Sequence, residues 1–213
     1  MNTATLPDMP PRKLVYLPIV HTLADMGGLG ESVSQQALQR LGRKRYSHKV
    51  ETIDGMWSAI ERVVDALPLD WGTVRLYQDG LPVCGQEKEI VEDLARAGSR
   101  NHQLLVRLMG KGAALMGTES ADLLVQEYQL ARQTLATEGT VRLSEGPRVT
   151  KSNGSDVLLE RRDQYIAKRI NETLNPGEVG ILFLGMLHSV AAMLDKDIGV
   201  EFPLYRPLSR FRG

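Results

Sequence analysis

The chain has few of the features that mark several large classes of protein. Cys84 is the only cysteine among its 213 residues, so no intrachain disulfide and no cysteine-based zinc cluster can form. No apolar run approaches the roughly 20 residues of a membrane-spanning helix, and the N-terminus lacks the apolar core of a signal peptide. We therefore expect a cytoplasmic protein without a membrane segment.

An excess of charge of either sign is also missing. Lys and Arg together number 26, as do Asp and Glu, and a general nucleic-acid binder usually has a basic excess. The segment from Arg40 to Lys49 is locally basic, and we interpret it as the solvated end of a helix, with basic residues suited to the helix dipole. Nucleic-acid binding through this segment and the C-terminal arginines is the weaker alternative.

The pattern of apolar residues predicts alternating strands and helices. The composition, 42% hydrophobic and 24% charged, is that of a soluble globular domain. Short apolar runs predict strands near 13–20, 73–79, 113–116, 179–185 and 199–205, and the long helical intervals between them allow the crossovers that parallel pairing needs. We expect a single α/β domain with a mainly parallel sheet and helices on both of its faces.

The same pattern predicts the limits of this domain. A flexible N-terminal arm is expected over 1–12, the domain over 13–205, and a basic C-terminal tail over 206–213. Inside the domain, the polar segment 138–156 is rich in Gly, Ser, Thr and Lys, which predicts a mobile loop.

The stretch from Glu178 to His188 is the best candidate for a functional strand end. Val179 to Leu184 is a nearly continuous apolar run, typical of a strand that is buried on both faces. Gly185 allows a sharp turn, and His188 follows at the carboxyl end, the edge where open α/β sheets bind ligands. His188 is therefore a candidate metal ligand or acid/base, and the alternative is a helix-start residue that bonds to the backbone.

Three other polar side chains follow predicted strands in the same way. His21 follows the first strand, Asp79 ends the second, and Glu119 follows the third. Asp79 precedes Gly80, so an ordinary turn is the alternative, and Glu119 could instead lie at a helix start where the dipole stabilises it. Parallel strands bring all such ends to one edge, so we expect these side chains to meet.

Arg162 and Asp163 are two charged residues on the apolar face of a predicted helix, which also carries Ile166 and Ile170. A buried unpaired charge is very costly, so these two must pair with each other, with another charge, or with a ligand.

The order of these motifs resembles the TraB/TIKI group and its distant relatives, the erythromycin-esterase-like and ChaN-like proteins. Those proteins carry GxxH motifs after an early and a late strand, an acidic strand end, a Gly-x-Glu-Thr-like helix start, and an Arg-Asn pair on a helix. Here the counterparts include Gly185-Met-Leu-His188 and Gly117-Thr-Glu119. Two positions depart from the pattern, since Pro18 replaces the first glycine and Asp163 replaces the asparagine.

The resemblance implies an α/β fold with one site at the strand ends, and metal-dependent hydrolysis of an ester or amide bond in a small-molecule or peptide substrate. His21, His188 and Glu119 would bind a divalent metal, Zn, Mn, Fe or Co. Glu119, Arg162 and Asp79 would be catalytic, and Arg162 and Asp163 would bind substrate, because a guanidinium can hold a carboxylate or phosphate.

Two alternatives remain open. A metal-free enzyme could use a histidine as general base, as the erythromycin-esterase resemblance implies. A non-catalytic protein could instead bind a small anionic ligand or haem, since members of the group differ in activity. A homo-oligomer is also left open.

Overall fold

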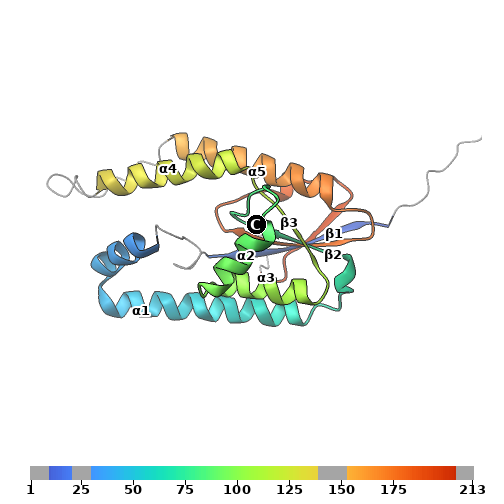
Figure 1. Ribbon diagram of the computed structural model, residues 1–213, viewed down its shortest axis with the longest axis horizontal. Coiled ribbons are helices and arrows are strands. Elements are labelled where there is room, and N and C mark those ends of the chain that lie inside the picture. The colour runs from blue at the N-terminus through green and yellow to red at the C-terminus, as the bar shows by residue number, and fades with distance from the viewer. Residues whose placement is uncertain (1–9, 21–29, 139–152, 205–213) are drawn as a thin grey trace, which may run out of the picture.

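The computed structural model describes residues 10–20, 30–138 and 153–204 and shows a parallel sheet between two layers of helices (Figure 1). The five strands lie in the order β3-β2-β4-β1-β5, and every neighbouring pair is parallel. The strands are β1 (Arg12–Ile19), β2 (Val74–Gln78), β3 (Ala114–Met116), β4 (Val179–Gly185) and β5 (Ile198–Glu201). The expected α/β fold is confirmed.

Within the described ranges, five α-helices and two short 3-10 helices connect the strands. They are α1 (Gly30–Asp65), η2 (Trp71–Thr73), α2 (Glu87–Arg96), α3 (Arg100–Gly110), α4 (Ala121–Glu138), α5 (Asn153–Thr173) and η3 (Ala191–Met193). Helices α1 to α3 lie on one face of the sheet, and α4 and α5 lie on the other (Figure 1). Helices therefore cover both faces, as predicted.

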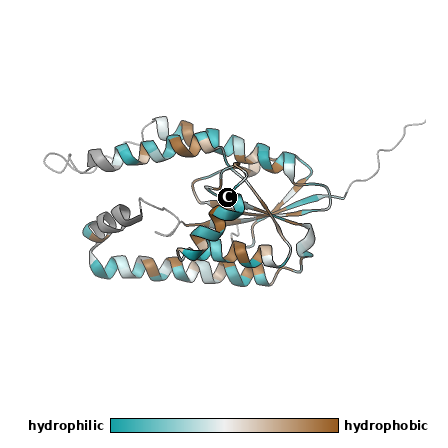
Figure 2. Ribbon diagram, in the orientation of Figure 1, coloured by the Kyte–Doolittle hydropathy of each residue, from teal (hydrophilic) through white to brown (hydrophobic). Residues whose placement is uncertain are grey.

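Successive side chains along each strand alternate between two separate hydrophobic clusters, one on each face of the sheet. Val15, Leu17 and Ile19 of β1 point into the cluster shared with α1 to α3, whereas Leu14 and Tyr16 point into the cluster shared with α5. This alternation follows from the two-residue period of a strand. Figure 2 shows hydrophobic residues gathered where strands and helices meet, with hydrophilic residues along the outer sides of the helices.

Helix α1 consists of two helical segments that meet at Gly42. Gly42 has a φ of 72°, a left-handed backbone that glycine adopts without steric cost, and it interrupts the helical geometry. Beyond it, Trp57, Ile60 and Val64 recur at helical spacing and are fully buried, so they form the face of α1 that packs into the core. Arg43, Lys44 and Arg45 of the basic segment are exposed, as a solvated helix surface requires.

The segment predicted as a loop is shorter than expected at both ends. Helix α4 continues to Glu138, and α5 already begins at Asn153, so residues 153–156 are helical. Residues 139–152 lie outside the described part of the chain, as do most of the predicted arm and the whole predicted tail. The last strand also ends early, at Glu201 rather than near residue 205.

Two arginines tie the elements together at the amino ends of the strands. Arg75 of β2 donates two hydrogen bonds to Glu178, at 2.6 and 2.7 Å, just before β4 begins. Arg12 of β1 donates to the backbone carbonyls of Asn171 and Leu174 near the end of α5, at 2.7 and 3.2 Å. Both arginines therefore lie at the end of the sheet opposite to the carboxyl ends of the strands.

Within the described ranges, none of the helices combines the length and the apolar character that crossing a membrane demands.

Candidate functional site

A buried network of charged side chains lies at the carboxyl ends of β2, β3 and β4. Asp79 follows the last residue of β2, Glu119 follows β3, and His188 follows β4, while α5 supplies Arg162 and Asp163. The strand order makes β3, β2 and β4 direct neighbours, so their ends meet on one edge of the sheet. All five side chains are at least 94% buried.

The guanidinium of Arg162 is the centre of this network. Its Nε donates to Glu119 Oε2 at 2.6 Å, and its Nη2 donates to Glu119 Oε1 at 2.6 Å and to Asp79 Oδ1 at 2.9 Å. Its Nη1 donates to Glu127 Oε1 at 2.5 Å, from α4. Such fork-like pairing is strong and directional, and it supplies the partners that the burial of Arg162 demands.

Backbone N–H groups hold the two buried carboxylates in place. Gly80 donates to Glu119 Oε1 at 2.8 Å, and Gly185 donates to Asp79 Oδ2 at 2.8 Å. The N–H groups of Thr118 and Glu119 both donate to Leu81, each at 2.9 Å, so the strand-end segments after β2 and β3 run side by side. Each carboxylate is therefore fixed by the turn that follows a neighbouring strand as well as by Arg162.

Gly117 is needed for this close approach. A Cβ atom at residue 117 would lie 2.8 Å from the Cα of Val83 and 3.1 Å from the carbonyl oxygen of Pro82. Both of these atoms belong to the backbone, so a side chain at residue 117 would push the two segments apart. The glycine of the Gly117-Thr-Glu119 motif thus sets the position of Glu119.

Asp163 and His188 form a second pair within the same network. His188 Nδ1 lies 2.5 Å from Asp163 Oδ1, and the N–H of Ser189 donates to Asp163 Oδ2 at 2.8 Å. A carboxylate only accepts hydrogen bonds, so Nδ1 donates to Asp163, and in the neutral form of the ring the lone pair lies on Nε2. Nε2 lies 3.7 Å from Asp79 Oδ1, too far for a hydrogen bond.

The described residues of the network include more carboxylates than cationic groups. Asp79, Glu119 and Asp163 are three buried carboxylates, and Arg162 is the one guanidinium among these described residues. Burial raises the pKa of Glu119 above its ordinary value, with the hydrogen bonds from Arg162 opposing this shift and the charge of Asp79 adding to it. Burial acts to lower the pKa of Arg162, but Glu119 and the other carboxylates outweigh it, so the guanidinium stays charged.

The structure brings together four of the five side chains expected to meet: Asp79, Glu119, Arg162 and His188. Of the alternatives expected for Asp163, which were a pair with Arg162, with another charge or with a ligand, the structure shows a pair with His188. His21 lies outside the described residues, so its predicted meeting with His188 stays a prediction.

The predicted metal set does not fit the contacts of Glu119. Both of its oxygens accept hydrogen bonds from Arg162, and one also accepts from Gly80, so a guanidinium takes the place that a metal ion would need. In the ranges that the structure describes, no three His, Cys, Asp or Glu side chains are grouped to hold a metal. We therefore derive no chemical step through a metal.

Two residues of the site were not predicted from the sequence. Glu127 contacts Arg162, although it lies on α4 with 48% of its side chain exposed. Tyr16 is buried in β1, where burial, with the charges of Asp163 and Asp79, raises the pKa of its hydroxyl to about 12. Glu127 has no sequence signal, because it reads as an ordinary surface charge. Tyr16 reads as an ordinary core aromatic in an apolar strand.

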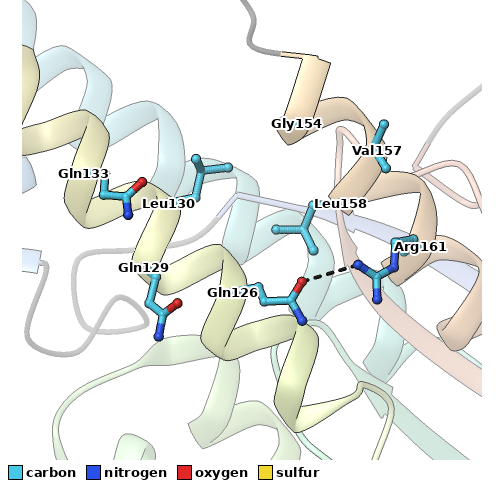
Figure 3. Close-up of a pocket in the computed structure, with 8 residues that line it drawn as sticks. All are labelled: Gln126, Gln129, Leu130, Gln133, Gly154, Val157, Leu158 and Arg161. Atoms are coloured by element: carbon cyan, nitrogen blue, oxygen red, sulfur yellow. Dashed lines mark hydrogen bonds between the residues drawn. The ribbon is translucent and has the colours of Figure 1, made fainter.

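A groove between α4 and α5 is separate from this network (Figure 3). It has a volume of about 520 Å³, and Arg161 donates to Gln126 across it at 3.3 Å. None of the network residues lines it. The lining residues are Gln126, Gln129, Leu130, Gln133, Gly154, Val157, Leu158 and Arg161.

Comparison with known proteins found no match among protein-family models, curated proteins or solved structures. The likeness to the TraB/TIKI group therefore rests on the short motifs quoted above and stays a prediction.

Proposed function

We propose that the protein is a hydrolase of ester or amide bonds in which His188 acts as a general base. The observation that carries this proposal is the Asp163–His188 pair, which leaves Nε2 without a hydrogen bond to any described residue. A neutral imidazole held by a carboxylate at a strand end is suited to accept a proton from an attacking water molecule.

In the proposed reaction, one proton moves from the attacking water molecule to His188 and then to the leaving group. A water molecule donates its hydrogen bond to His188 Nε2 and attacks the carbonyl carbon of the substrate, and the proton moves to Nε2 as the new C–O bond forms. The imidazolium is stabilised by Asp163 on one side and by the charge of Asp79, 3.7 Å from Nε2, on the other. Nε2 then returns the proton to the leaving alcohol or amine as the scissile bond breaks.

Arg162 has a positioning role in this mechanism and does not bind an anionic substrate group. It already makes four hydrogen bonds to three carboxylates, which leaves little donor capacity for a substrate. Its hydrogen bond to Asp79 helps to hold that carboxylate 3.7 Å from Nε2 of His188. The predicted substrate-binding role would require a substrate anion to displace one of these carboxylates.

The test is hydrolysis of a panel of 4-nitrophenyl esters and 4-nitroanilides by the purified protein and its variants. We expect His188→Ala to lower kcat/KM by about 100-fold or more, the range of a lost general base. His48→Ala is the matched control, because His48 is an exposed histidine on α1, and it should leave kcat/KM unchanged. If no substrate is cleaved, or if His188→Ala is as active as the wild type, the proposal is wrong.

Asp163→Asn and chelation test the details. Asp163→Asn should lower kcat without unfolding the protein, because an amide has one acceptor oxygen and cannot accept from both His188 Nδ1 and the N–H of Ser189. A neutral amide also stabilises the imidazolium poorly. Dialysis against a chelator should leave activity unchanged. A complete loss that Zn or Mn restores would instead support the metal-dependent version that requires His21.

A further inference from the structure

The turn that carries His188 has an unusual composition. The N–H of His188 donates to Gly185 at 3.1 Å, so Met186 and Leu187 are the two central residues of a β-turn. Such positions are usually taken by Gly, Pro, Asn, Asp or Ser. Two large apolar residues break this rule directly beside the proposed general base.

Both side chains are open to solvent. Met186 is 66% exposed and Leu187 is 80% exposed, the two highest values for large hydrophobic residues in the described part of the chain. Single exposed hydrophobic residues are common, but here two adjacent ones lie at the tip of one turn, next to a site. We call this pair, Met186 and Leu187, the apolar lip.

The lip is held firmly beside the site. Gly185 donates to Asp79, and His188 and Ser189 both contact Asp163, so each end of the turn is fixed to a buried carboxylate. A ligand part that covers the lip would therefore lie close to His188 with little ordering of the protein itself. Pre-organisation of this kind favours binding.

The charge of the buried network limits which ligand groups can bind beside the apolar lip. In the described part of the network, Arg162 is bound by Asp79, Glu119 and Glu127, and Asp163 adds a further carboxylate against His188. A substrate with a negative charge close to the scissile bond would therefore be repelled. The chemistry that matches both features is an uncharged apolar chain attached to the carbonyl group.

We infer that the apolar lip binds the acyl chain of the substrate, and that the substrate is an ester or amide of an uncharged, apolar carboxylic acid. This inference rests on the hydrolase function proposed above. Burying about two methylene groups on the lip would raise kcat/KM roughly tenfold, at about 0.8 kcal/mol for each group.

The first experiment measures kcat/KM for 4-nitrophenyl esters from acetate to octanoate. In the wild type, kcat/KM should rise about tenfold or more along the series. In the double variant Met186→Ser with Leu187→Ser, it should vary by less than about threefold along the series, with thermal stability preserved because both side chains are exposed. Val157→Ser is the matched control, an exposed apolar residue on α5 away from the turn, and it should keep the wild-type dependence.

The second experiment compares two acyl groups of equal length, hexanoate and the monoester of adipate. The adipate ester carries a terminal carboxylate, and we expect the wild type to prefer hexanoate by about tenfold or more. Equal rates for the two esters would overturn the inference that the substrate is uncharged.

The outcomes separate this inference from the proposed function. If acetate and octanoate are cleaved equally well, or if the double variant keeps the dependence on chain length, the lip inference fails while the hydrolase stands. If no ester is cleaved, both fail. If the lip binds neutral phosphatidylcholine vesicles while the soluble esters show no dependence on chain length, the lip contacts a lipid surface and the acyl-chain inference is wrong.

Discussion

At the scale of single residues, Arg162 favours the ionised forms of the buried carboxyl groups of Asp79 and Glu119. Replacing it by Met keeps much of the volume but removes the guanidinium that pairs with Asp79 and Glu119. We expect Arg162→Met to lower the free energy of unfolding by about 3–5 kcal/mol at pH 7, measured by urea denaturation. Arg161→Met is the control, because Arg161 is exposed and should change stability by less than about 0.5 kcal/mol.

The sign of the pH dependence gives a second check on Arg162. Without the guanidinium, the pKa of Glu119 in the folded protein rises further above its value in the unfolded chain, because the hydrogen bonds that oppose this shift are lost. The resulting cost is absent at pH values below the unfolded pKa, grows as the pH rises above it, and is fully present above the folded pKa. The gap between wild type and Arg162→Met should therefore be larger at pH 7 than at pH 4. An equal gap at both pH values would contradict the account.

The sequence predicts the charged residues of the site better than it predicts their partners. Arg162 could be found because a charge on an apolar helix face must be paired, and Asp79 and Glu119 could be found because they follow apolar runs. That Asp163 bonds to His188 depends on how α5 lies across β4, which no local pattern encodes. Glu127 could not be found, since its role depends on the packing of α4 against α5.

At the scale of elements, the contact between the segments after β2 and β3 depends on Gly117. We expect Gly117→Ala to lower the free energy of unfolding by about 1–3 kcal/mol, the usual cost of overpacking, because the added Cβ would meet the backbone of Pro82 and Val83. Because Glu119 is two residues away, the proposed hydrolase activity should fall as well. Chemical denaturation and kcat/KM are the measurements.

Gly55 is the matched control for this substitution. It lies in helix α1, and a Cβ there would meet no atom within 4 Å. Gly55→Ala should therefore stabilise the protein by about 0.5–1 kcal/mol, since alanine is the better helix former. If both substitutions change stability by the same amount, the contact at Gly117 is not tight.

The elements themselves were more predictable than their ends. Apolar runs and helical periodicity locate all five strands, because a buried parallel strand has a continuous hydrophobic signature. The start of α5 at Asn153 was missed, since Asn153, Gly154 and Ser155 are poor helix formers that resemble a loop. Here the helix extends beyond the sheet alongside α4, a tertiary contact that outweighs local propensity (Figure 1).

At the scale of the whole molecule, the Arg75–Glu178 pair connects the sheet's neighbouring strands β2 and β4. The hydrogen bonds from Arg75 hold the pKa of Glu178 below its ordinary value. Stability from this pair is therefore present at pH values above the unfolded pKa and is lost as the pH falls through the lowered pKa. Glu178→Gln should cost about 1.5–3 kcal/mol at pH 7, and this cost should shrink toward zero near pH 2, measured by urea denaturation.

Glu172→Gln is the control for this pair. Glu172 is half exposed and lies near Lys168 on the surface of α5, where a salt bridge contributes little. Its substitution should leave stability almost unchanged at both pH values. If Glu178→Gln is equally mild at pH 7, the pair does not stabilise the sheet.

The pairing of β1 with β4 has a consequence for synthesis of the protein on the ribosome. Lys13 pairs with Val179 in the middle of the sheet, although almost the whole chain separates them. At about 5–20 residues per second, β1 leaves the ribosome roughly ten seconds or more before its partner exists. During that interval the apolar residues of β1 have no native sheet to join. The native sheet can therefore form only after β4 has been made, and we expect transient contacts to cover the apolar residues of β1 until then.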